Sequence, residues 1–191
     1  MKHIVLAITG ASGACYATSL AGQLAGCGHK VHLIVSPMGR RLLQDECGID
    51  EPSGLLGETS PLLVEHAYAD LADLLASGSV ATDGMVVCPA SVNTIAALAA
   101  GLCDNLITRC AFVHLKERRK LVLVPRETPT TAIDLENQAR LAGAGAIVLP
   151  ASPGFYAKPS TIQDLVDFLV ARILDALGIE HPLGQRYGKL E

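Results

Sequence analysis

The sequence predicts an α/β domain of three layers, in which a mainly parallel β-sheet lies between two layers of helices. Short apolar runs, typical of buried parallel strands, alternate along the 191 residues with longer segments of helical spacing. Several of these runs end in Gly, Ser or Pro and lead directly into a helix start. This alternation is typical of βαβ units. The length fits a single domain over residues 1–191.

The first βαβ unit organises the rest of the chain. An apolar strand over residues 3–9 ends in the turn Gly10-Ala11-Ser12-Gly13, and a helix of small residues follows over residues 15–25. A helix start presents free N–H groups and a positive dipole end, so this turn predicts a phosphate site. An ordinary strand-to-helix turn also favours glycine. The spacing is not Gly-x-Gly-x-x-Gly, so a dinucleotide is not the expected ligand.

The second strand, over residues 30–35, ends at Ser36. Nicotinamide-binding folds usually have an acid at this point for the ribose hydroxyls, so the sequence argues against NAD and leaves Ser36 as a candidate ligand donor. In the next helix, over residues 38–47, Glu46 either faces inward or is a solvated acid at the helix end. Residues 48–61 are rich in Gly, Pro and Ser and predict a surface excursion.

Residues 62–75 predict a short strand and a helix, which lead into Ala76-Ser77-Gly78-Ser79. This loop either binds a second phosphate through hydroxyl and N–H groups or is a flexible turn. A buried strand over residues 84–89 ends in Ser91-Val92-Asn93-Thr94, where Ser91 is the expected N-cap of a helix. Because such exits align at the carboxyl edge of a parallel sheet, we expect them to meet at a ligand site.

The helix predicted over residues 104–118 carries Arg109 and Lys116 two turns apart, and therefore nearly on one face. Both an inward phosphate site and a solvated face fit these two side chains. The next three basic residues, Arg118, Arg119 and Lys120, are expected to be solvated at the helix end.

A buried strand over residues 121–124 ends in Pro125-Arg126-Glu127-Thr128-Pro129. The prolines fix this exit, and Arg126 and Glu127 point to different sides if the chain is extended. A charged pair at the mouth of a parallel sheet suggests anion binding beside proton transfer. A helix over residues 131–142 and a last strand over residues 146–149 follow.

The loop over residues 150–159 contains three prolines and the pair Phe155-Tyr156. It predicts a rigid loop that presents aromatic rings to an apolar or flat ligand, although a packed crossover loop is also consistent. The final helix, over residues 161–177, is amphipathic, with Ser160 or Thr161 as its cap and Arg172 in its second half.

Composition limits the class of protein. Mean hydropathy of +0.36 is high for a soluble monomer, yet no apolar run approaches the ~18 residues that span a membrane, so subunit interfaces are expected. A net charge of −4 argues against nucleic acid as the main partner. Six cysteines without a Cys-x-x-Cys pair, and the lack of a signal peptide, predict a reducing cytoplasm and no structural metal.

Six motifs occur in the order found in one enzyme family, and together they cover nearly the whole chain. The motifs are Gly10-Ala11-Ser12-Gly13-Ala14, Ala76-Ser77-Gly78-Ser79, Cys88-Pro89-Ala90-Ser91, Leu115-Lys116-Glu117-Arg118-Arg119, Val124-Pro125-Arg126-Glu127-Thr128-Pro129 and Pro153-Gly154-Phe155-Tyr156. With these motifs the chain resembles the flavin prenyltransferases of the UbiX type, long described as aromatic acid decarboxylases. Two departures are Ala90, in place of a common cysteine, and Tyr187, in place of a common tryptophan.

The resemblance implies a Rossmann-like or flavodoxin-like flavoprotein domain that assembles into a dodecamer. It implies a transferase that binds reduced FMN and joins a dimethylallyl group from dimethylallyl monophosphate to flavin N5 and C6. The product would be prenylated FMN, the cofactor of UbiD-type decarboxylases, and no metal is implied. No nucleic acid or membrane partner is expected.

The resemblance also assigns roles to residues. The flavin would be bound by Gly10, Ala11, Ser12, Ser36, Ser91, Val92, Asn93, Thr94 and Arg126. The prenyl phosphate would be bound by Ser77, Gly78, Arg109, Lys116, Tyr156 and Arg172. Proton handling would fall to Ser12, Glu46 and Glu127, and Lys116 would join the catalytic set. Positive side chains suit a reaction in which phosphate leaves an allylic carbon, because they stabilise the departing oxygens.

Three other functions remain as alternatives. Flavin-dependent decarboxylases of cysteinyl substrates share the fold and a Pro-Ala-Ser-x-Asn-Thr turn, but they have a histidine shortly before that turn, and residues 67–88 contain none. A flavin-binding subunit without chemistry is possible, although Ser12, Glu46, Lys116 and Glu127 are all present. A nicotinamide dehydrogenase is least consistent with Ser36.

Overall fold

The computed structural model describes residues 1–57 and 60–183, and Tyr187 lies outside the described residues. Six parallel strands form one sheet in the order β3-β2-β1-β4-β5-β6. The strands are β1 (His3–Ile8), β2 (Lys30–Val35), β3 (Leu63–His66), β4 (Gly84–Ala90), β5 (Leu121–Pro125) and β6 (Ile147–Val148). The predicted three-layer fold is confirmed, with the strand order of the Rossmann fold.

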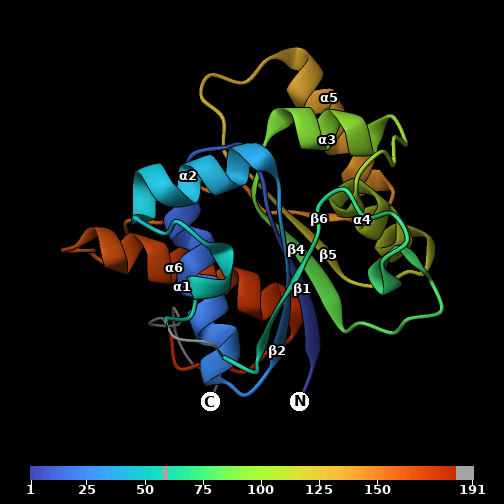
Figure 1. Cartoon of the computed structure of the whole chain (residues 1–191). Helices are drawn as coiled ribbons and strands as arrows, with labels where there is room; N and C mark the ends of the chain where they lie inside the picture. The colour runs from blue at the N-terminus through green and yellow to red at the C-terminus, as the bar shows by residue number, and fades with distance from the viewer. Residues whose placement is uncertain (58–59, 184–191) are drawn as a thin grey trace, which may run out of the picture.

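Helices cover both faces of the sheet (Figure 1). One face carries α1 (Ala14–Gly26), α2 (Pro37–Cys47) and α6 (Ile162–Leu177). The other face carries α3 (Val92–Ala99), α4 (Leu106–Lys116) and α5 (Ala132–Gly143), while η1 (Pro52–Gly54) and η2 (Leu74–Ala76) are short 3₁₀ turns. Among the described helices, none is both long enough and apolar enough to cross a bilayer.

The strands are apolar throughout because both faces of the sheet are covered. In β1, Ile4, Leu6 and Ile8 pack beneath α1 and α6, whereas Val5 and Ala7 pack beneath α3 and α4. Side chains alternate between the faces of a strand, so a strand covered on both sides needs apolar residues at every position. This is why the short apolar runs could be identified as strands from the sequence.

The predicted helix between β3 and η2 does not form. The carboxylate of Asp70 accepts the N–H of Ala72, and that of Asp73 accepts the N–H of Leu75, both over two residues. Such local bonds offer the backbone an alternative to helical hydrogen bonds. The segment therefore follows a series of turns that ends in η2, and the helix prediction is wrong.

The order of the strands places a crevice between β1 and β4. The chain leaves β1 toward α1 on one face and leaves β4 toward α3 on the other, so the two exits diverge at the carboxyl edge. Thr9, which is 2% exposed, connects the exits: its hydroxyl donates to Pro89 O (2.7 Å) and accepts from Ser91 N (2.7 Å). Ligands of open α/β sheets bind at such a switch point.

Candidate functional site

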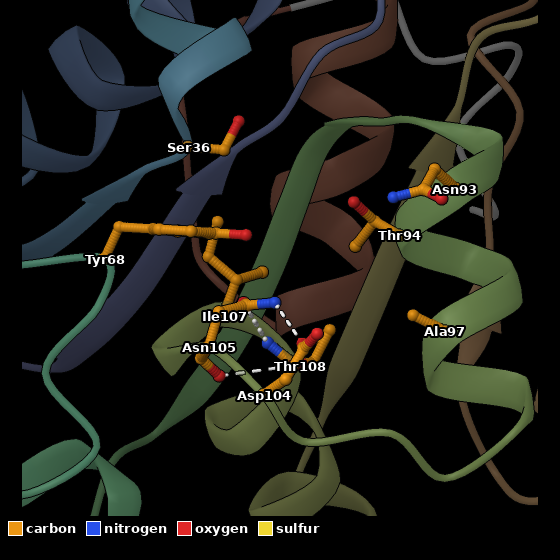
Figure 2. A pocket seen from close by; sticks show the side chains of 9 residues that line it. All are labelled: Ser36, Tyr68, Asn93, Thr94, Ala97, Asp104, Asn105, Ile107 and Thr108. Atoms are coloured by element: carbon orange, nitrogen blue, oxygen red, sulfur yellow. Dashed lines mark hydrogen bonds between the residues drawn. The ribbon is translucent and has the colours of Figure 1, made fainter.

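A pocket lies at the carboxyl edge of the sheet, where the starts of three helices face one another (Figure 2). Ser36 lies at the start of α2, Asn93 and Thr94 at the start of α3, and Asn105 at the start of α4. The complete lining is Ser36, Tyr68, Asn93, Thr94, Ala97, Asp104, Asn105, Ile107 and Thr108. Converging helix starts carry positive partial charge, which favours an anion such as a phosphate group.

Short polar caps hold these helix starts in place. Ser36 Oγ accepts from Gly39 N (3.0 Å), Ser91 Oγ accepts from Thr94 N (3.3 Å), and Asn105 Oδ1 accepts from Thr108 N (3.0 Å). The predicted N-cap role of Ser91 is confirmed. The hydroxyl of Thr94 also bonds that of Ser91 (2.9 Å), so each cap fixes a polar group at the rim of the pocket.

Sequence reasoning found Ser36, Asn93 and Thr94 but missed the opposite wall of the pocket. The side chain of Tyr68 points from the segment after β3 toward the gap between the helices (Figure 2), and its backbone carbonyl accepts from Leu106 N (2.8 Å). Asn105 before an apolar helical run is a recognisable N-cap signal. No local signal marks Tyr68, because its place depends on the pairing of β3 with β2.

The turn after β1 is arranged differently from the phosphate site that the sequence predicts. The carboxylate of Glu46 accepts from Gly13 N (2.9 Å) and Ala14 N (2.8 Å), so an acid of this chain already occupies the start of α1. Gly13 has φ of 116°, a left-handed conformation that favours glycine. The prediction that these N–H groups bind phosphate is therefore wrong, and Glu46 does face inward.

The environment of Glu46 keeps it ionised. Partial burial alone would raise its pKa, but the hydrogen bonds from Gly13 N, the Ser12 hydroxyl and Ala14 N, together with the charge of Arg126, lower the pKa below its usual value. The helix start adds positive potential. Ser12 and Glu46 thus form one hydrogen-bonded unit beside the switch point.

The two charged residues at the exit of β5, Arg126 and Glu127, have different surroundings, as predicted: Arg126 is half-buried and Glu127 is exposed. Arg126 Nε donates to Ser12 O (3.0 Å), which bridges the exits of β5 and β1 across β4. Glu127 is exposed, and its carboxylate accepts from Thr128 N (3.1 Å). The exit therefore places a cation beside the Ser12 turn and leaves a carboxylate toward solvent.

Arg109 and Lys116 share a face of α4 and contact one loop, which we call the serine loop (Ala76–Val80). Arg109 Nε donates to Ala76 O (3.0 Å). Lys116 Nζ pairs with Glu117 Oε1 (3.1 Å) and lies 3.1 Å from the position that a Cβ on Gly78 would take. The predicted common face of Arg109 and Lys116 is confirmed.

Two of the basic residues that the sequence assigns to a solvated helix end have structural partners. Arg119 donates from Nη1 to Val80 O (2.7 Å) and from Nη2 to Gly78 O (2.5 Å), while Lys120 Nζ donates to Leu177 O (2.6 Å). The prediction is wrong for Arg119, which is half-buried, whereas Lys120 is exposed as predicted although its ammonium has a carbonyl partner. Their carbonyl partners belong to segments distant in sequence, so no local pattern could have shown these bonds.

The structure does not bring Lys116 and Arg172 together within one chain. Lys116 is the last residue of α4 and lies near the amino edge of the sheet. Arg172 lies on α6, which packs on the opposite face, and its Nη1 pairs with Asp175 Oδ2 (3.1 Å). Tyr156 lies in the exposed loop before α6 and stacks edge-on against Phe168. Within one chain the sheet separates these residues, so a site that contains all of them needs more than one copy of the chain.

The chain matches the model of the family described as Flavoprotein over residues 1–174. It is 43% identical over 189 residues to the flavin prenyltransferase UbiX of Methanothermobacter thermautotrophicus, and the match covers 98% of this chain and 96% of that relative. The chain belongs to the flavin prenyltransferase family of the UbiX type. The family resemblance drawn from the six motifs is therefore confirmed.

Solved structures of flavin prenyltransferases have the same fold. AnUbiX (PadA1), crystallised with FMN and dimethylallyl pyrophosphate, has a TM-score of 0.93 and 38% identity, covering 100% of this chain and 99% of that one. A dodecameric FMN-dependent UbiX-like decarboxylase from Escherichia coli O157:H7 has a TM-score of 0.89 and 38% identity, and the match covers 98% of this chain and 100% of that one. The cysteine decarboxylase TvaF has 18% identity and a TM-score of 0.63, and the match covers 93% of this chain and 99% of that one. At this identity the likeness shows a shared fold alone.

Proposed function

We propose that this flavin prenyltransferase joins the dimethylallyl group of dimethylallyl monophosphate to N5 and C6 of reduced FMN. The observation that carries the proposal is the polar pocket at the switch point, lined by Ser36, Asn93 and Thr94, in a chain that resembles an FMN-bound relative over its full length. The residues fit a flavin mononucleotide because the helix starts suit its single phosphate. Reduced FMN supplies the electron-rich N5 and C6 atoms that take up the alkyl group.

In this proposal the flavin lies across the crevice between the β1 and β4 exits. Hydroxyl, amide and N–H groups at the starts of α2 and α3 hold the phosphate end, and the turn after β1 faces the ring. Arg126, fixed by its bond to Ser12 O, contacts the flavin from the β5 exit. The flavin-binding set is Gly10, Ala11, Ser12, Ser36, Ser91, Val92, Asn93, Thr94 and Arg126.

The prenyl phosphate requires cations, because its carbon–oxygen bond breaks and phosphate leaves without the help of a metal. Ser77, Gly78, Arg109 and Lys116 are grouped in one chain, whereas Tyr156 and Arg172 lie across the sheet. We propose that different copies of the chain supply these two groups, in a closed oligomer such as the dodecamer of the E. coli relative. Each phosphate site then lies between subunits.

Proton transfer falls to the acids at the crevice. Ring closure would begin when the alkene of the N5-linked dimethylallyl group takes up a proton from an acid at the crevice or from the departed phosphate, which opens its tertiary carbon to attack by C6. The carbon–carbon bond would then form and C6 would give up its own proton, for which Glu127 or the departed phosphate is the candidate base. Ser12 and Glu46 form the second hydrogen-bonded group near the reacting ring. The hydrogen bonds from Gly13 N, Ala14 N and the Ser12 hydroxyl hold the pKa of Glu46 below its usual value, and the carboxylate orients Ser12.

The product is expected to serve a UbiD-type decarboxylase, and we propose a cytoplasmic protein that acts as one flavoprotein domain over residues 1–191. The compartment is inferred from the sequence, in which six cysteines occur without a Cys-x-x-Cys pair.

An anaerobic assay tests the reaction. The full-length protein is incubated with reduced FMN and dimethylallyl monophosphate, and the mass of the extracted flavin is recorded, with omission of the prenyl donor as the control. We expect the flavin to gain the mass of one dimethylallyl unit, with release of inorganic phosphate. An unchanged flavin would refute the transferase, and carbon dioxide release from a cysteinyl peptide would favour a cysteine decarboxylase instead.

A further inference from the structure

We propose that Arg119 is a positioning residue that holds the serine loop against Lys116; this inference rests on the proposed function. The loop has few bonds of its own. Val80 N donates to Ser77 O at 3.3 Å, and the hydroxyls of Ser77 and Ser79 bond each other at 2.8 Å. Its place therefore depends on the side chains that reach it from α4 and the residues after it.

Arg119 makes the strongest of these contacts. Its guanidinium donates to two carbonyls of the loop at once, Gly78 O at 2.5 Å and Val80 O at 2.7 Å, and the side chain is partly buried. A planar guanidinium can hold two acceptors in a fixed geometry, which a lysine ammonium on a flexible stem cannot. Hydrogen bonds from a charged donor are also stronger than those from a neutral one.

Arg119 is itself fixed to the end of α4. The helix ends at Lys116, Arg118 turns the chain with a left-handed φ of 55°, and Arg119 N donates to His114 O (2.8 Å). Two side chains from the end of α4 and the residues after it therefore lie at Gly78: the Lys116 ammonium is close to its Cα, and the Arg119 guanidinium donates to its carbonyl. The Lys116 ammonium and the loop therefore lie beside each other at the end of α4.

Gly78 lies close to the side-chain ends of Lys116 and Glu117. A Cβ at that position would lie 3.1 Å from Lys116 Nζ and would overlap the carboxylate of Glu117. If the bonds from Arg119 are lost, the carbonyls of Gly78 and Val80 no longer have the guanidinium that ties the loop to the end of α4. The serines and the ammonium then no longer face one phosphate group, although Arg119 touches no reacting atom.

This arrangement predicts a specific kinetic change. The flavin pocket lies at the opposite edge of the sheet, so Arg119→Gln should leave FMN binding unchanged. We expect the KM for dimethylallyl monophosphate to rise about tenfold, which corresponds to about 1.4 kcal/mol, with kcat within about twofold of wild type. Arg119→Lys should give a smaller rise, and added guanidinium ion should restore the KM of Arg119→Ala.

Arg118→Gln is the matched control, because the side chain of Arg118 has no hydrogen bond or ion pair among the described residues. It should behave as wild type. A KM of Arg119→Gln equal to wild type would overturn the proposal. So would a loss of flavin affinity in parallel with KM, since that would indicate general disruption. If Arg119→Gln does not assemble, Arg119→Lys replaces it in every comparison.

Hydrogen exchange separates this proposal from the proposed function. In the full-length protein without ligands, the amides of Ser77 to Val80 should exchange faster in Arg119→Gln, with no change at the start of α3. If wild-type protein fails to prenylate FMN, the proposed function fails while this exchange result still supports the role of Arg119. Unchanged exchange in the loop would overturn the positioning role even in an active enzyme.

Discussion

Thr9 shows how one buried hydroxyl can fix a binding site that it does not enter. It lies at the end of β1, where its side chain both donates to Pro89 O and accepts from Ser91 N. The turn after β1 and the start of α3 are thereby held at a constant separation across the switch point. A buried polar group contributes most when all of its bonds are satisfied, as they are here.

Thr9→Val keeps the shape of the side chain and removes both bonds. Because the half-buried Ser91 N loses its acceptor, we expect the free energy of unfolding to fall by about 1–3 kcal/mol. FMN affinity should fall as well, since the rim of the pocket loses its support. Urea unfolding and flavin fluorescence titration measure the two effects.

Thr18→Val is the control for that change, because the Thr18 hydroxyl bonds Cys15 O within α1 and the Cys47 thiol of α2, and neither bond supports the rim of the pocket. It should alter stability by less than about 0.5 kcal/mol and leave FMN binding unchanged. Equal behaviour of the two variants would contradict the special role of Thr9.

At the scale of elements, three neighbouring strands are joined by a chain of histidines. His3 Nδ1 bonds His32 Nε2 (3.0 Å), His32 Nδ1 bonds His66 Nε2 (3.0 Å), and His66 Nδ1 bonds a carboxylate oxygen of Asp73 (2.7 Å). The carboxylate only accepts, so every neutral ring must donate through Nδ1 toward Asp73. A second added proton would set two N–H groups against each other, so the chain holds one extra proton at most.

The histidine chain predicts a loss of stability in mild acid. Burial, and then repulsion from His66, His3 and Lys30, lower the pKa of His32 to about 4, against which Asp73 acts only in part. The unfolded chain has the ordinary, higher histidine pKa, so it binds a proton first as the pH falls. The contribution of neutral His32 to the free energy of unfolding is therefore fully present near neutral pH, and it is lost as the pH falls from about 6.5 to about 4.

His32→Gln, which cannot titrate, should flatten this pH dependence. We expect the difference in unfolding free energy between pH 7 and pH 5 to shrink by about 1 kcal/mol relative to wild type, after allowing for partial screening by solvent. Urea unfolding at both pH values measures it, with wild type and variant compared at the same pH because Asp73 and Glu46 also titrate below that range. An identical slope would show that His32 does not resist protonation.

At the scale of the whole molecule, the sheet itself separates the expected phosphate ligands. Lys116 and Arg172 belong to helices on opposite faces, so one chain alone cannot close a site around a single phosphate. Large apolar side chains remain exposed on the described surface, among them Ile133 (69%) and Phe155 (69%). Exposed apolar groups of this size favour contacts between copies.

Mixed oligomers test this division of the site. Lys116→Ala and Arg172→Ala should each be inactive alone. Co-expressed with different tags and purified through both, they should recover about one quarter of wild-type activity, because a random assembly pairs two intact contributors at about that fraction of sites. No recovery would mean that both residues serve the same site from the same chain. Co-expression of Lys116→Ala with itself under two tags is the control.

The sequence by itself determined the layers of the fold and the chemical types at the strand exits. Buried strands covered on both faces are apolar at every position, and Ser, Gly and Pro mark the turns, so Ser36, Ser91 and Arg126 could be placed at one edge from local pattern alone. The six motifs, in order, gave the family. These signals are local, because they depend on neighbours within a few residues.

Only the tertiary structure decided which groups meet. Glu46 caps α1 from another helix, Arg119 reaches two carbonyls of a distant loop, and Tyr68 completes the pocket because β3 pairs with β2. It also separated Lys116 from Arg172. Contacts between segments far apart in the chain depend on strand order and on which face each helix covers, and neither leaves a mark in the local pattern of residues.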